Sequence, residues 1–113
     1  MPFYNLREME KGAIGPTYST AYGSMVHGQH LEVALVRFQA RRGAKPHRHP
    51  NEQMMFVLKG RLQARIGDEH LVAQPGDILH MPADVEHEVM ALDEDVEVIS
   101  VKNLVDGKGS PRE

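Results

Sequence analysis

The sequence predicts an all-β protein with a single folded domain. From Leu31 onward, short segments alternate apolar and polar residues with a period of two, and turn residues separate them. The chain has 113 residues, of which 41% are hydrophobic and 26% are charged, a composition that supports one folded core. About seven or eight short, closely spaced strands favour a sandwich or a closed barrel, because these architectures leave few strand edges exposed.

The expected strands share this alternation and cover residues 31–38, both arms of a hairpin at 53–67, and residues 78–81, 87–92 and 96–101. The hairpin is predicted to turn at Lys59-Gly60, and Gly67-Asp68 begins the following turn. Glycine suits both positions because it tolerates a positive φ. A Pro-Gly-Asp run at 75–77 is a type II turn signal before the next strand.

The same patterns divide the chain into three parts. Residues 1–30 are expected to form an N-terminal arm or edge strand, residues 31–102 the barrel, and residues 103–113 a C-terminal tail. The first 24 residues are weakly patterned, and the chain ends in the polar run DGKGSPRE. Such an end is typical of a mobile terminus.

Composition excludes several classes of function. The chain has no cysteine, so it has neither disulfides nor thiolate ligands, and any metal must bind to nitrogen and oxygen. A net charge of -3 without a long basic run argues against a nucleic-acid partner. The chain shows no signal-peptide pattern and no apolar run near the roughly 20 residues that span a bilayer, so we expect a cytoplasmic protein without a membrane partner. A small molecule is the expected partner.

Two histidines in KPHRHPNEQ form the most informative motif. His47 and His49 are two residues apart, and on one strand their side chains would point to the same face and could share a metal ion. Gln53 begins the next expected strand and can offer its amide oxygen, and His87 would arrive from a distant strand. By itself, this motif is equally consistent with two solvated histidines beside Arg48.

Two longer segments resemble the motifs of the cupin family. GAKPHRHPNEQMMFVLKG is similar to the first cupin motif, and PGDILHMPADVEH is similar to the second. The resemblance covers residues 31–101. It implies a double-stranded β-helix (cupin or jelly-roll) barrel and, commonly, a homodimer. Two departures are Gly43, which lies closer to His47 than is usual, and Ala91, where many members carry asparagine.

The resemblance also implies one divalent metal ion per chain. Its ligands would be His47, His49, Gln53 and His87. Most cupins carry glutamate at the position of Gln53, whereas three imidazoles and an amide leave the full +2 charge of the ion in place. Such a site favours anionic ligands and Lewis acid chemistry. Zinc, nickel, iron, manganese, cobalt and copper all suit these donors.

HRHPNEQMMFVLKG is similar to the first motif of cupins that ketonise unsaturated monouronates released from pectin and alginate, and some polyketide cyclases are similar as well. The uronate enzymes carry an aspartate and an aromatic residue after the last strand, where this chain has Ser100 and Lys102. The later SPRE matches their Pro-Arg-Glu run only after an insertion. We therefore transfer the metal ligands alone.

Several further residues could lie at the barrel mouth, in its pocket or in its core. The basic residues Arg41, Arg42, Lys45 and Arg48 could rim the barrel mouth and attract a carboxylate, or form a solvated loop. Glu86 and Glu88 flank His87 and could orient it, although neighbours on a strand face away from it. His80 could line the pocket, whereas His27, His30 and His70 are expected at the surface. Met54, Met55, Met81 and Met90 are expected to fill the core or an interface.

Three functions are consistent with the sequence. The neutral ligand set favours a metal enzyme acting on a small carbonyl, enol or hydroxy-acid substrate by isomerisation, cyclisation or hydrolysis. The second is a metal-dependent dioxygenase, and the third is a cupin that binds a small ligand without turnover. Consumption of oxygen would distinguish the second from the first.

Overall fold

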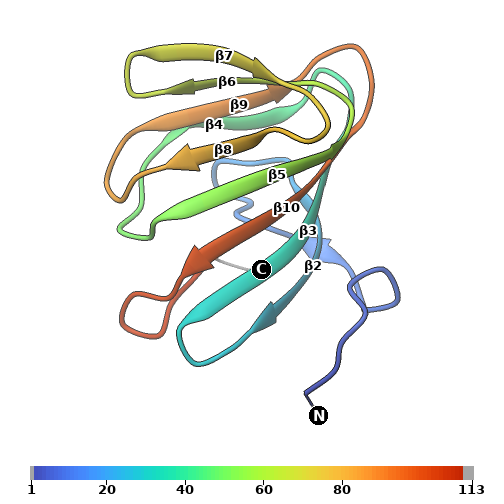
Figure 1. The fold of residues 1–113 in the computed structure, drawn as a ribbon, viewed down its shortest axis with the longest axis vertical. Coiled ribbons are helices and arrows are strands. Elements are labelled where there is room, and N and C mark those ends of the chain that lie inside the picture. Colours follow the sequence, from blue (N-terminus) through green and yellow to red (C-terminus); the bar gives the residue numbers. More distant parts are fainter. Residues whose placement is uncertain (1, 111–113) are drawn as a thin grey trace.

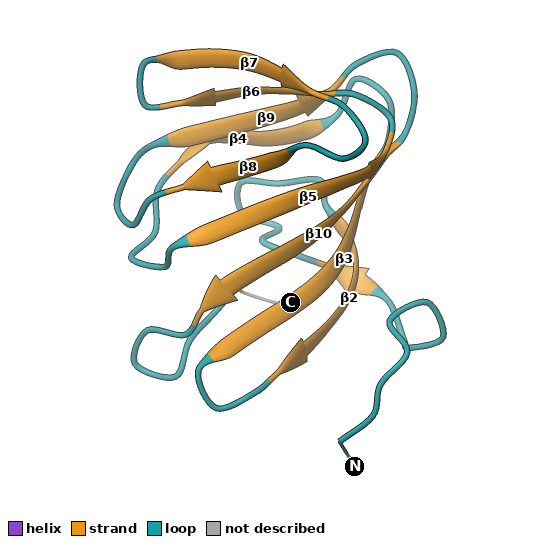
Figure 2. Cartoon of the chain, in the orientation of Figure 1, coloured by secondary structure: helices purple, strands orange, loops and turns teal. Residues whose placement is uncertain are grey.

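The computed structural model describes residues 2–110, which form ten strands and no helix (Figure 2). The strands in chain order are β1 (Gly12–Ala13), β2 (Tyr22–His27), β3 (Leu31–Phe38), β4 (Gly43–His47), β5 (Gln53–Lys59), β6 (Leu62–Ile66), β7 (Glu69–Ala73), β8 (Ile78–Met81), β9 (His87–Ala91) and β10 (Val96–Asn103). The all-β prediction is confirmed. Within this described part, no helix has the length and hydrophobicity that crossing a membrane requires.

The strands form two antiparallel sheets. The six-stranded sheet has the order β1-β2-β3-β10-β5-β8, and the four-stranded sheet has the order β4-β9-β6-β7. In Figure 1 the four-stranded sheet lies at the top and the six-stranded sheet fans out below it. From β3 to β10, every connection except β6–β7 passes from one sheet to the other. This alternation is the topology of a double-stranded β-helix, as predicted.

The expected hairpin at residues 53–67 is wrong. Strand β5 pairs with β10 and β8, whereas β6 pairs with β7 and β9 in the other sheet. Gly60, with a φ of 79°, lies at the corner between the sheets, and a Cβ there would come within 2.5 Å of the Asp95 carbonyl oxygen. The hairpin of this region is β6–β7, which turns at Gly67-Asp68. Alternation identifies strands, but it does not identify their partners.

Inward-facing residues of the three central strands change from apolar to polar along the barrel. The cross-strand rows on β3, β10 and β5, from the apolar end to the polar end, are Val36–Val98–Val57, Ala34–Ser100–Met55 and Glu32–Lys102–Gln53. All nine side chains are buried. Burying charged groups is costly unless they are paired or bind a ligand. The polar end of the interior is therefore the place to look for a functional site.

Described residues near both ends of the chain pack onto the six-stranded sheet. In the N-terminal part, the Ser24 hydroxyl donates to the Leu6 carbonyl, which holds the arm against β2. After β10, residues 104–110 fold back over the polar end, and Ser110 contacts β3 and β10. The described part of the expected tail is thus attached to the barrel. Residues 111–113 of that tail lie outside the described residues.

Candidate metal centre

Three histidines meet at the polar end of the barrel. His47 ends β4 and pairs in register with His87, which begins β9. His49 lies two residues beyond the end of β4, so the expectation of both residues on one strand is wrong, and the loop rather than the strand alternation brings its ring to the others. One ligand nitrogen from each of the three lies within 4.8 Å of the other two. The structure thus brings all three predicted histidines together.

Backbone carbonyl groups fix the orientation of each ring. In every case Nδ1 lies at hydrogen-bond distance from a main-chain oxygen two residues away, and the pairs are His47 with Lys45 (2.7 Å), His49 with Asn51 (2.9 Å) and His87 with Val85 (3.0 Å). A carbonyl oxygen only accepts, so Nδ1 carries the proton and donates. Each neutral ring then presents an unprotonated Nε2, as metal-binding histidines do.

His87 shows why a cation fits this place. The residue is 1% exposed, and its Nε2 is the only buried side-chain polar atom in residues 2–110 that lacks a hydrogen-bond partner. Buried polar atoms in folded proteins almost always have a partner, and exceptions call for a reason. A metal ion bound by this group of three nitrogens would give the buried nitrogen a partner.

Gln53 brings an amide oxygen to the histidine cluster from β5. Its side-chain Nε2 donates to the Ser100 hydroxyl at 2.9 Å, which turns Oε1 toward His49, 3.1 Å from the ring Nε2. Because the proton of the neutral His49 ring is on Nδ1, the facing nitrogen and oxygen are both acceptors. Two acceptors in contact are stabilised by a cation that both can bind. The four residues named from the sequence therefore lie at one place and offer donors suited to a divalent ion.

The electrostatic environment keeps these rings neutral. Burial lowers the pKa of His47, His49 and His87, and for His87 it lowers the pKa to about 4. The positive charge of Lys102 lowers the pKa of all three further. Burial also lowers the pKa of Lys102 itself, which the nearby charge of Glu32 opposes. Neutral imidazole is the form that binds a metal.

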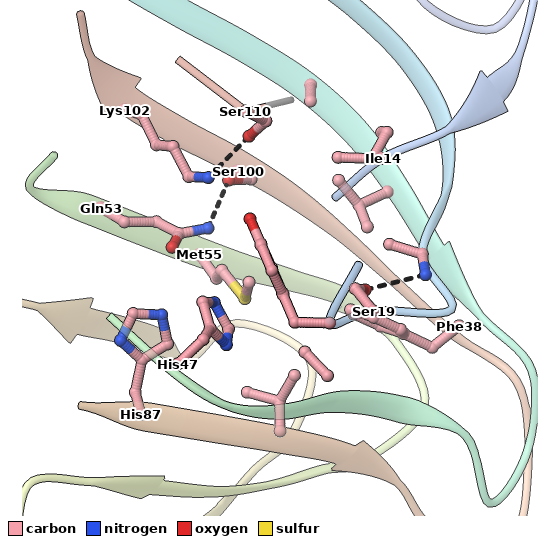
Figure 3. Close-up of a pocket in the computed structure, with 16 residues that line it drawn as sticks. Ile14, Ser19, Phe38, His47, Gln53, Met55, His87, Ser100, Lys102 and Ser110 are labelled. Atoms are coloured by element: carbon pink, nitrogen blue, oxygen red, sulfur yellow. Dashed lines mark hydrogen bonds between the residues drawn. The ribbon is translucent and has the colours of Figure 1, made fainter. Parts of the chain in front are cut away.

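A cavity of about 40 Å³ extends from the histidines into the barrel (Figure 3). Its inner wall is apolar and includes Ile14, Val36 and Phe38, and its polar wall includes Ser100, Lys102 and Ser110. Tyr18 also lines it and stacks on the ring of His47, with ring centroids 3.8 Å apart. The volume suits a small ligand group, so a larger ligand would have to extend out of the cavity.

Several other predicted candidates face away from this cavity. His80 lies on the outer side of the sheet and pairs with Glu52 at 2.8 Å, so the expectation that it lines the pocket is wrong. Glu86 and Glu88 both bind Arg65, which leaves neither beside the His87 ring nitrogens. Other histidines that were expected at the surface are exposed there, namely His27, His30 and His70.

The basic segment does not rim the site as a unit. The backbone nitrogen of Arg41 donates to the carbonyls at the end of β9 opposite His87, so Arg41 and the adjacent Arg42 lie at the other end of the barrel. Arg48 lies between His47 and His49 in the sequence and is exposed. Met55 and Met81 lie in the core, as predicted, whereas Met54 and Met90 are exposed on the outer faces, where a role in an interface stays a prediction.

Sequence reasoning missed three residues of the polar end. Tyr18 lies in a segment without periodicity, and Ser110 lies in the expected tail. Glu32 had a usable signal, because in LEVALVRF it shares the inward phase of Ala34 and Val36. A charged residue at an inward position of a strand is a reason to expect a functional or paired group.

The fold and the polar end of the barrel together define a small cupin, and the chain belongs to the cupin family. The family's cupin domain matches residues 34–102, more than half of the 113 residues. No curated protein sequence matches the chain.

Solved structures with the same fold cover nearly the whole chain. KdgF from Halomonas sp. has a TM-score of 0.80 and 23% identity, over 91% of this chain and 93% of that one. An RmlC-like cupin from Shewanella frigidimarina has a TM-score of 0.80 and 18% identity, over 91% and 90%. A cupin-2 domain from Rhodospirillum rubrum has a TM-score of 0.78 and 17% identity, over 100% and 80%. At these identities the likeness shows the fold, and function must be argued from the site.

Proposed function

We propose that this cupin binds one divalent metal ion through His47, His49, Gln53 and His87, and that it is an enzyme acting on a small carbonyl, enol or hydroxy-acid substrate. The reaction class is isomerisation, cyclisation or hydrolysis. The observation that carries the proposal is the close grouping of three histidine ring nitrogens, one of them buried and without a partner in residues 2–110, with the Gln53 amide oxygen 3.1 Å from the His49 nitrogen.

The charge of the donor set favours this chemistry over others. Three neutral imidazoles and one amide do not reduce the charge of a divalent ion. Such an ion, when bound, polarises a carbonyl oxygen and lowers the pKa of an attached water. A carboxylate in place of Gln53 would instead partly neutralise the ion, as in many oxygen-activating sites.

The remaining residues of the cavity would position the substrate. Ser100 holds the Gln53 amide through its 2.9 Å hydrogen bond, and Tyr18 fixes the plane of the His47 ring by stacking on it. The apolar wall, which includes Val36 and Phe38, would exclude water from the inner end of the cavity. Together they restrict the ligand to a small group with its oxygens toward the polar end.

The reaction class can be tested with metal-loaded protein and small panels of unsaturated uronates, enones and 2-oxo acids. Turnover without uptake of oxygen would support the proposal. Oxygen consumption coupled to substrate loss would identify a metal-dependent dioxygenase instead, and binding without turnover would identify a ligand-binding cupin.

Gln53→Glu provides a matched variant for the role of charge. The substitution keeps the side-chain length and an oxygen donor, so the protein should still bind one metal ion. We expect lower turnover, because the added carboxylate reduces the effective charge of the ion. His70→Gln is a suitable control, since His70 is exposed on β7, away from the cluster.

A further inference from the structure

Lys102 is a charged side chain in the barrel interior, and residues 2–110 leave part of its hydrogen-bond donors without a partner. It lies on the inner face of β10 and is 4% exposed. An ammonium group has three N–H donors. The hydroxyl of Ser110, 2.6 Å away, is the one hydrogen-bond partner that residues 2–110 provide for it. Because a buried charge is costly when its donors are unused, this arrangement points to a ligand.

The lysine lies in the same cavity as the candidate metal ligands. Lys102 is the direct cross-strand partner of Gln53, a geometry that places the two Cβ atoms about 4.5–5.5 Å apart. Both residues line the cavity, together with His47 and His87. Figure 3 shows the Lys102 and Gln53 side chains extending from neighbouring strands into the space that the two histidine rings also face.

The counter-charge of Lys102 is turned away from that space. Glu32, its cross-strand partner on β3, is fully buried and accepts hydrogen bonds from the Ser110 backbone and hydroxyl and from His27. Burial opposes its ionisation, but these hydrogen bonds and the positive charge of Lys102 together outweigh burial and lower the pKa of Glu32. Lys102 and Ser110 line the cavity and Glu32 does not. A ligand in the cavity would therefore meet the Lys102 ammonium group and not the Glu32 carboxylate.

We propose that Lys102 is the anion-binding residue of this cavity, and that the ligand is a small 2-oxo or 2-hydroxy carboxylate. Its carboxylate would bind the ammonium group, and its carbonyl or hydroxyl oxygen would face the histidines. The inference rests on the proposed function, because the metal is the second anchor of the ligand. It deepens that function by naming the substrate class. A cavity of about 40 Å³ accommodates the two oxygen-bearing groups of such an acid.

The test compares the binding of pyruvate, as a simple 2-oxo acid, to cobalt-loaded wild-type protein and to Lys102→Gln, with metal content measured first on each sample. We expect Kd for pyruvate to rise at least tenfold in Lys102→Gln. Methyl pyruvate, which lacks the charge, should bind both proteins alike. Lys59→Gln is the matched control, because Lys59 is exposed at the far end of β5, about 20 Å along the strand from Gln53.

A measurement on the wild-type protein covers the case in which Lys102→Gln folds poorly because Glu32 loses its cationic neighbour. In the zinc-loaded protein, pyruvate should shift the side-chain 13Cε resonance of Lys102 and leave that of Lys59 in place. Equal pyruvate affinity in metal-loaded wild-type and Lys102→Gln protein, or an unmoved Lys102 resonance at saturation, would overturn the inference alone. Absence of metal binding in the wild type would overturn the proposed function, an outcome that the metal analysis identifies separately.

Discussion

Replacement of His87 by leucine should have small effects in the absence of metal and large effects in its presence. In metal-free protein, the variant loses the 3.0 Å hydrogen bond from Nδ1 to the Val85 carbonyl, worth about 1 kcal/mol, and it removes a buried unpartnered Nε2, which costs about 1–3 kcal/mol. The two effects oppose each other, so the free energy of unfolding should change by about 1–2 kcal/mol at most.

With metal present, the wild type and His87→Leu should differ in thermal stability. At a free metal concentration 100 times Kd, binding to the folded state adds about 2.7 kcal/mol to the wild type. For a domain of this size, that raises Tm by roughly 10 °C. His87→Leu should gain little of this, because one donor is lost from the centre of the cluster.

The assay is thermal unfolding of both proteins in EDTA and in excess zinc, with His80→Leu as the control. His80 is exposed on the outer face, so its variant should keep the zinc-dependent rise in Tm. Equal stabilisation of the wild type and His87→Leu by zinc would refute the reasoning. So would a loss of several kcal/mol by His87→Leu in EDTA, because His87 would then be an ordinary structural residue.

Three further predictions concern pH and assembly. Burial holds the pKa of His87 at about 4, so below pH 6.5 the unfolded chain binds a proton that the folded metal-free protein does not. The free energy of unfolding should therefore fall by about 3 kcal/mol between pH 6.5 and 4. Urea denaturation of His87→Leu across this pH range should lack this decrease. Hydrogen bonds from Arg7 hold the pKa of Glu97 at about 2, so its stabilisation is present above pH 4.5 and is lost as the pH falls toward 2. Glu97→Gln should therefore cost about 1 kcal/mol at pH 7 and much less at pH 2 by the same method. We also propose a homodimer through the outer face of the six-stranded sheet, where Phe56 and Ile78 are exposed cross-strand neighbours. Light scattering should then show a monomer for Phe56→Lys. A mass unchanged from that of the wild type would place any dimer elsewhere.

Local features of the fold could be predicted from the sequence, and long-range pairing could not. The alternation in residues 31–38 and 78–81 gave the bounds of β3 and β8 as the structure has them, because side-chain periodicity is a local property. Strand β5 pairs with β8 and with β10, the latter more than 35 residues away, and nothing in the local pattern of residues 53–67 indicates these partners. The predicted hairpin failed for this reason.

At the candidate site, too, local motifs were predictable from the sequence and contacts between distant strands were not. Its four residues could be named because the spacing of the motifs resembles that of cupins, although His49 reaches the site from a loop rather than a strand. The place of Lys102 could not be foreseen, because it depends on the pairing of β10 with both β3 and β5, which brings Glu32, Lys102 and Gln53 into one row. Single-strand alternation marks a residue as inward, and only register identifies its neighbours.

The most direct test of a metal-binding cupin is elemental analysis of tag-free protein, after exposure to a mixture of divalent metals and removal of the excess. The structure leads us to expect close to one metal ion per chain in the wild type, and far less in His47→Ala and His49→Ala variants prepared in the same way. Retention of metal by both variants would place the ion elsewhere. No bound metal in the wild type would contradict the metal centre itself.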